Sequence, residues 1–181
     1  MNINYEYLKK KEYKFGHVQE NIEMIIYSAI CFFIPFFIGH PQLLVGVIVN
    51  ASLILAALNL RNYRLLPIIM LPSLGVLSRG IIFGPFTVFL IYMIPFIWIG
   101  NSILVYTFKL LNLEKKINRW VTLLIGSITK AAFLFAIAFL FVNLGILPKL
   151  FLTTMGIFQF YTAILGGITA FGIQAVKKKI I

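Results

Sequence analysis

One apolar stretch, AAFLFAIAFLFV at residues 131–142, decides the fold class of this 181-residue chain. A strand of a membrane β-barrel alternates apolar and polar residues over about ten positions, whereas this stretch is apolar on every face. Over the whole chain, 61% of the residues are hydrophobic, compared with about 45–50% in a soluble domain. The sequence therefore predicts an all-α integral membrane protein.

Outward from that stretch, the chain divides into six apolar segments, each near the roughly 20 residues that a helix needs to cross a bilayer. The expected helices cover residues 22–39, 42–60, 65–83, 85–111, 120–145 and 151–176. No linker rich in proline, glycine or serine separates them. We therefore expect a single membrane domain over residues 1–181, with an amphipathic cytoplasmic lead-in at 1–21, a compact bundle of six transmembrane helices at 22–176 and a basic tail at 177–181.

Positive charge is concentrated in alternate gaps between the expected helices. Thirteen of the 16 lysine and arginine residues lie before the first helix, after the second, around the gap between the fourth and fifth, or after the sixth. The opposite gaps and their borders hold only His40, Arg79 and Lys149. Because basic loops stay on the cytoplasmic side, the pattern predicts a multi-pass protein of the cell membrane with both termini in the cytoplasm.

Residues that carry acid–base or metal chemistry are scarce. The sequence has no Asp, its five Glu residues lie near the expected cytoplasmic surface, and Cys31 is the single cysteine. His17 and His40 fall on opposite sides of the predicted membrane. A catalytic constellation or a metal site is therefore not expected. No phosphate-binding loop is present, so any ATP hydrolysis would come from partner subunits. We expect no enzymatic activity and no cofactor.

Arg79 and Lys130 are the two cations inside the expected spans that depart from this charge sorting. Burying a charge in a membrane costs at least about 2.5 kcal/mol on insertion scales, so such a residue indicates a functional site. Arg79 lies near a helix end, from which its side chain can instead extend outward. Asn50, Tyr92 and Gln159 are expected at overlapping depths, although each alone is also a common interhelical hydrogen-bonding residue. The five residues together predict an outward-opening polar pocket.

Prolines and glycines gather in and after the third expected helix, and they form a candidate gate: Pro72, Gly75, Gly80, Gly84 and Pro85. Proline removes a backbone donor, and glycine adopts conformations that other residues avoid. Irregular backbone at membrane depth is tolerated where it lines a cavity. An ordinary kinked helix followed by a connecting loop is the alternative interpretation.

Small residues repeat every four positions along the sixth expected helix, which predicts close contact with another helix inside or outside the chain. The members of this candidate packing interface are Thr162, Ala163, Gly166, Gly167 and Ala170.

Three short sequences carry a resemblance to a known family: GPF at residues 84–86, GSITK at 126–130 and GGITA at 166–170. With its size and six expected helices, the chain over residues 22–179 resembles the substrate-binding S component of energy-coupling factor (ECF) transporters. In place of that family's common Ala-x-x-x-Ala coupling motif, the first helix has Ser28, Ala29 and Cys31. The resemblance implies external capture of a vitamin, a vitamin precursor or a metal ion, and association with a membrane coupling subunit and two cytoplasmic ATPases.

The sequence thus favours a membrane-embedded small-solute binding component of an uptake transporter. Because no acid is expected near Arg79 and Lys130, the solute is predicted to be an anionic micronutrient that bears a carboxylate or phosphate. The alternative is a non-catalytic membrane anchor or assembly subunit, in which these two cations meet another chain. The expected partners are the solute, the lipid bilayer and, by resemblance, the coupling subunit and ATPases, but no nucleic acid.

Overall fold

The computed structural model describes residues 16–38, 41–83 and 88–180, and these residues form helices and connections with no strand. A 3-10 turn, η1 (Asn62–Arg64), precedes α4, and a π-helix, η3 (Phe108–Glu114), continues α5. The α-helices are α2 (His17–Phe37), α3 (Gln42–Asn59), α4 (Leu65–Phe83), α5 (Val88–Thr107), α6 (Arg119–Asn143), α7 (Leu150–Met155) and α8 (Ile157–Ile180).

The lengths and compositions of these helices are those of a multi-pass membrane protein. Five segments are long and apolar enough to cross a bilayer: His17–Phe37, Gln42–Asn59, Phe89–Glu114, Arg119–Asn143 and Leu150–Lys177. The all-α membrane class predicted from the sequence agrees with this finding.

Both ends of the described chain differ from the expected boundaries. α2 begins at His17, so the last residues of the expected lead-in are helical, because Glu20 is buried against basic residues that follow α3. The rest of the lead-in, residues 1–15, lies outside the described residues. At the other end, α8 continues through the basic tail to Ile180, and Gly156 separates it from α7.

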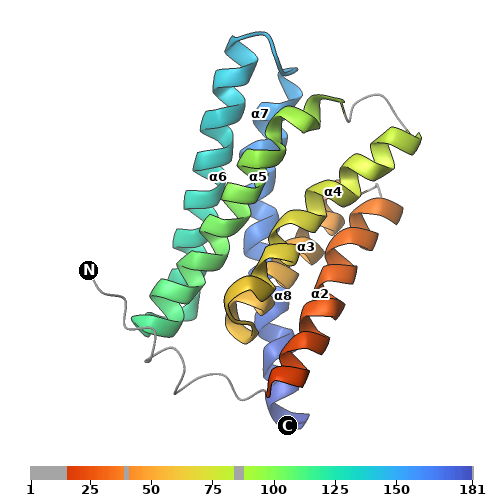
Figure 1. The fold of residues 1–181 in the computed structure, drawn as a ribbon. Coiled ribbons are helices and arrows are strands. Elements are labelled where there is room, and N and C mark those ends of the chain that lie inside the picture. The colour runs from red at the N-terminus through yellow and green to blue at the C-terminus, as the bar shows by residue number, and fades with distance from the viewer. Residues whose placement is uncertain (1–15, 39–40, 84–87, 181) are drawn as a thin grey trace.

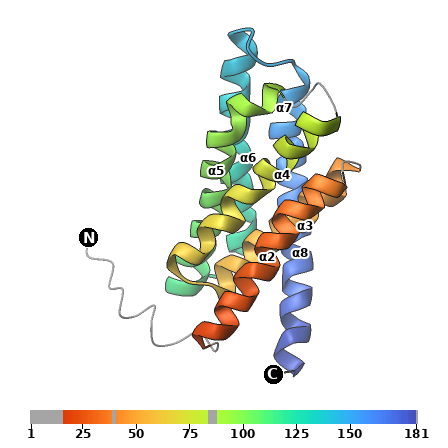
Figure 2. The ribbon, with the colours of Figure 1, turned by 45° about the vertical axis from the view of Figure 1, so that its right-hand side comes forward.

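The helices pack as neighbouring pairs, with α3 at the centre. Figures 1 and 2 show α2 beside α4 and α5 beside α6, while α8 runs along α3. All eleven residues from Val49 to Asn59 are buried, which places this half of α3 in the core. α2 begins and α8 ends at one end of the bundle, here named the terminal end, and the turn between α6 and α7 lies at the opposite end (Figure 1).

Glycines allow the closest helix approaches. A Cβ atom added to Gly166 on α8 would lie 2.8 Å from the backbone nitrogen of Ala51 on α3. At Gly167 it would collide with Leu123 of α6. All five residues of the candidate packing interface are buried, so this face of α8 is occupied by helices of the same chain.

The described part of the candidate gate is a continuous helix. α4 passes through Pro72, Gly75 and Gly80 without interruption. The broken helix considered from the sequence is therefore not observed over residues 65–83, where a Cβ at Gly75 would instead collide with the carbonyl oxygen of Phe32 on α2. Gly84 and Pro85 lie outside the described residues. Gly75 thus permits close packing of α2 and α4.

Candidate functional site

Lys130 lies at the middle of α6, eleven residues after Arg119 and thirteen before Asn143. Its side chain points into the bundle and the residue is only 2% exposed. The Nζ atom donates hydrogen bonds to Oδ1 of Asn50 on α3 at 2.6 Å and to Oδ1 of Asn101 on α5 at 2.9 Å. Three helices therefore meet at one amino group.

The two carboxamides are held so that their oxygens face Lys130. Asn50 Nδ2 donates to the backbone oxygen of Gly46 at 2.9 Å and to Thr162 Oγ1 on α8 at 3.1 Å. Asn101 Nδ2 donates to the backbone oxygen of Ile69 on α4 at 3.0 Å. Because a carbonyl oxygen only accepts, the NH₂ group of each asparagine must face these backbone atoms. This network fixes the orientation of both amide oxygens.

We name Lys130, Asn50, Asn101 and Thr162 the central polar cluster, because each lies near the middle of its span. Asn50 is eight residues after Gln42 and nine before Asn59, and Asn101 is twelve after Phe89 and thirteen before Glu114. Thr162 is twelve residues after Leu150 and fifteen before Lys177. At 1.5 Å per residue, the cluster lies roughly 12–22 Å from the ends of these helices.

The charge of Lys130 has no acidic partner among the residues that the structure describes. The ion pairs found there involve only Glu20 and Glu23, both near the start of α2. An ammonium group has three donor hydrogens, and two of those on Lys130 are used by the asparagines. One turn earlier on the same helix, the buried Ser127 hydroxyl makes no hydrogen bond within the described chain. Hydrogen-bonding capacity therefore remains on the Lys130 amino group and on the Ser127 hydroxyl.

The structure brings together Lys130 and Asn50 but separates Tyr92 and Arg79 from them. Tyr92 precedes Asn101 by nine residues on α5, which corresponds to the opposite face of the helix, and it is 52% exposed. Arg79 is ten residues beyond Ile69 on α4, or about 15 Å along the helix axis. Gln159 lies one turn before Thr162 and is only partly buried.

The sequence interpretation missed the role of Asn101 and assigned Thr162 only to helix packing. Asn101 gave the same local signal as Asn50, a carboxamide inside an apolar span. Counted from the expected helix start at residue 85, however, Asn101 falls about twice as deep as Asn50. The spans differ in length, so counting positions from the outer ends does not identify which residues share a depth.

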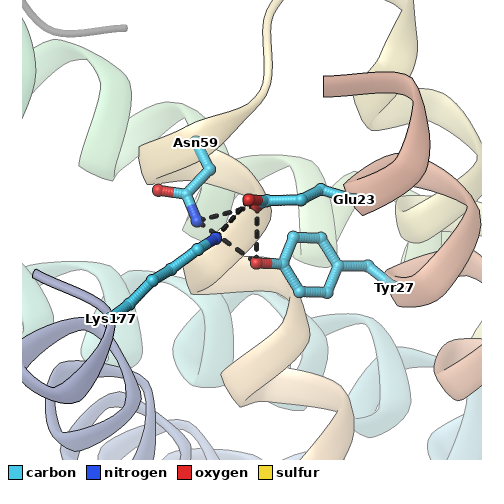
Figure 3. Close-up of polar contacts among 4 residues, drawn as sticks. All are labelled: Glu23, Tyr27, Asn59 and Lys177. Atoms are coloured by element: carbon cyan, nitrogen blue, oxygen red, sulfur yellow. Dashed lines mark hydrogen bonds and ion pairs between the residues drawn. The ribbon is translucent and has the colours of Figure 1, made fainter. Parts of the chain in front are cut away.

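A second polar group lies at the terminal end of the bundle. Figure 3 shows Glu23 and Tyr27 from α2, Asn59 from α3 and Lys177 from α8 pointing toward one another. Tyr27 donates to Glu23 Oε2 at 2.8 Å, and Asn59 Nδ2 donates to the same oxygen at 3.1 Å. Lys177 forms an ion pair with Glu23. In contrast to the central polar cluster, this group has its own acid.

Glu20 forms a neighbouring ion-paired group three positions earlier on α2. Its buried carboxylate pairs with Arg61 and with Arg64, the latter at 3.2 Å, and Arg64 Nε also donates to Asn21 Oδ1 at 2.7 Å. The charge of Glu20 is thus matched by residues that follow α3. These groups join the first, second and last described spans, and the pairing of both glutamates with cations supports a structural role.

Comparison of the chain with protein-family models, with curated proteins and with solved structures finds no match. Within the described residues, no group of three or more His, Cys, Asp or Glu side chains is placed to hold a metal ion. What the central polar cluster provides is a buried cation held by neutral oxygens, which is suited to recognition of negative charge.

Proposed function

We propose that this protein is the solute-binding component of a membrane uptake transporter and captures an anionic solute from outside the cell. The observation that carries the proposal is the Lys130 ammonium at the middle of the bundle, bound by Asn50 and Asn101 without an acidic partner in the described part of the chain. Ionisable groups at such depth in membrane proteins mark solute and ion pathways, because their burial is costly. A bound anion would neutralise this charge.

The proposal includes six spans of the cell membrane with both termini in the cytoplasm. α4 has 19 residues, about the length of a span, and would be the sixth. An even number of spans returns both termini to one side. The positive residues near the terminal end favour the cytoplasm for that side.

We expect Lys149, in the connection between α6 and α7, to face the outside and Lys115, between η3 and α6, to face the cytoplasm. The variants Lys149→Cys and Lys115→Cys would each be made in a Cys31→Ala background and treated with a membrane-impermeant maleimide. Intact cells should be labelled only when they carry Lys149→Cys, and Lys115→Cys should react after permeabilisation. Equal labelling of both variants in intact cells would contradict the topology.

Transport requires an energy source, and the resemblance to ECF S components supplies a specific hypothesis. After external capture, a membrane coupling subunit and two cytoplasmic ATPases would reorient this chain and release the solute inside. The protein itself would bind the solute and perform no hydrolysis.

The alternative role as a membrane anchor or assembly subunit is less well supported. It requires Lys130 and the small residues of α8 to meet another chain. Lys130 is instead buried against Asn50 and Asn101, and Gly166 packs on α3. These contacts favour an internal binding site over an intersubunit contact at the same residues.

Purification from the native membrane with a mild detergent distinguishes the two roles. We expect a coupling membrane protein and ATPases to co-purify. Denaturation of the sample should release a small anionic compound, which mass spectrometry would detect. A sample of the Lys130→Met variant, prepared in parallel, should lack that compound while retaining the same proteins. A stable redox or biosynthetic complex without a bound solute would support the anchor instead.

A further inference from the structure

We infer that the site at Lys130 accepts a single anionic group and that Asn50 and Asn101 set this charge selectivity, an inference that rests on the solute-binding role proposed above. The two asparagines present oxygens to Lys130 as two aspartates would. A carboxamide has nearly the shape of a carboxylate but carries no charge. The asparagines can therefore hold the ammonium without neutralising it.

The hydrogen bonds on the far side of each asparagine strengthen this distinction. Asn50 and Asn101 use their NH₂ groups to bind the backbone oxygens of Gly46 and Ile69. A carboxylate at either position has no hydrogen to donate there, so the surroundings select the neutral amide. The same contacts hold the amide oxygens toward Lys130. The positive charge of Lys130 is therefore fixed in place and remains available to an anionic ligand.

The number of cations at this depth limits the ligand to one anionic group. Lys130 is the charged member of the central polar cluster, and Arg79 lies about 15 Å farther along α4 than the carbonyl oxygen that binds Asn101. The third donor of Lys130 is available to one carboxylate or one phosphate, and the unbonded hydroxyl of Ser127 lies one turn earlier on α6.

Asn101→Asp tests the role of charge because it changes the charge with little change in shape. An aspartate there would pair with Lys130 and compete with an anionic ligand. Asn101→Leu is the matched variant, because it also removes the hydrogen bond to Ile69 but leaves the site positive. Asn143→Asp introduces the same charge at the exposed end of α6 and serves as the second control.

The measurement is equilibrium dialysis of the purified full-length protein against radiolabelled benzoate and against benzamide, its neutral isostere. We expect the wild type to prefer benzoate by about tenfold or more, because a charge-assisted contact is replaced by a neutral one. Asn101→Asp should reduce this ratio by at least about tenfold and by more than Asn101→Leu does, whereas Asn143→Asp should change it by less than about threefold. Asn50→Asp, measured in the same way, should repeat the loss if Asn101→Asp does not fold.

The possible outcomes test the ligand class, the role of Asn101 and the transport role separately. Absence of any preference for benzoate, or for inorganic phosphate, in the wild type would overturn the assignment of the ligand class. Equal losses in Asn101→Asp and Asn101→Leu would show that Asn101 only supports the structure. If the expected pattern of binding is found but no solute uptake or coupling partner accompanies the protein, the charge selectivity stands and the transport role fails.

Discussion

Lys130→Met is expected to lower solute affinity by about 30-fold or more and to reduce uptake at low solute concentration by a similar factor. Removing one partner of a buried charged contact commonly costs about 2–5 kcal/mol, which corresponds to at least this change in affinity. Methionine has a similar length and a flexible side chain that can fill the same space. The variant should therefore fold, since it replaces a buried cation while leaving the helix packing intact.

The matched control is Lys149→Met, which removes an exposed lysine from the connection between α6 and α7. This variant should bind solute as the wild type does. Arg79→Gln should cause a smaller loss than Lys130→Met, because Arg79 lies well away along α4 from the Asn101 contact. Binding would be measured with the compound released from the purified wild type. Unchanged affinity in Lys130→Met, or a wild-type preference for cations, would contradict the assignment.

Helix positions followed from the sequence where local signals marked them. α3 begins at Gln42 directly after Pro41, and α4 covers Leu65–Phe83 as expected. The start of α2 did not follow, because Glu20 has the polarity of a surface residue. It is buried only because Arg61 and Arg64 pair with it from distant positions in the chain. Such long-range pairing leaves no periodic signal near the helix start.

Only part of the candidate site was predictable, because its residues come from helices that are distant from one another in the sequence. Lys130 and Asn50 stand out because they are polar residues in apolar spans. Which other residues face them depends on the rotation of each helix, and α5 is apolar on nearly all its faces, so its sequence does not mark an inner side. Tyr92 and Asn101 were therefore indistinguishable by pattern, although the packed helix buries Asn101 and leaves Tyr92 half exposed.

The structure also indicates a different role for Gly75 from the one considered from the sequence. From the sequence, a glycine three residues after Pro72 was consistent with a hinge in a gate. In the folded chain, Gly75 lies directly against the backbone of Phe32, where α2 and α4 approach closely. Its lack of a side chain is thus required for packing whether or not α4 moves during transport.

Gly75→Ala is consequently expected to destabilise the protein by about 1–3 kcal/mol, the usual cost of overpacking a core. The added methyl group would meet the carbonyl oxygen of Phe32, which belongs to the backbone and cannot rotate away. α2 and α4 must then separate along their contact. The loss should exceed the gain in helix propensity that alanine brings over glycine.

Gly172→Ala on α8 provides the matched control, because a Cβ atom there would meet no other atom within 4 Å. It should leave stability unchanged or raise it by up to about 1 kcal/mol through helix propensity. Thermal unfolding of both variants in one detergent, followed by size-exclusion chromatography, measures the difference. If Gly75 is instead a hinge, Gly75→Ala should unfold at the same temperature as the wild type while solute uptake slows. That result would support a role for Gly75 in the gate.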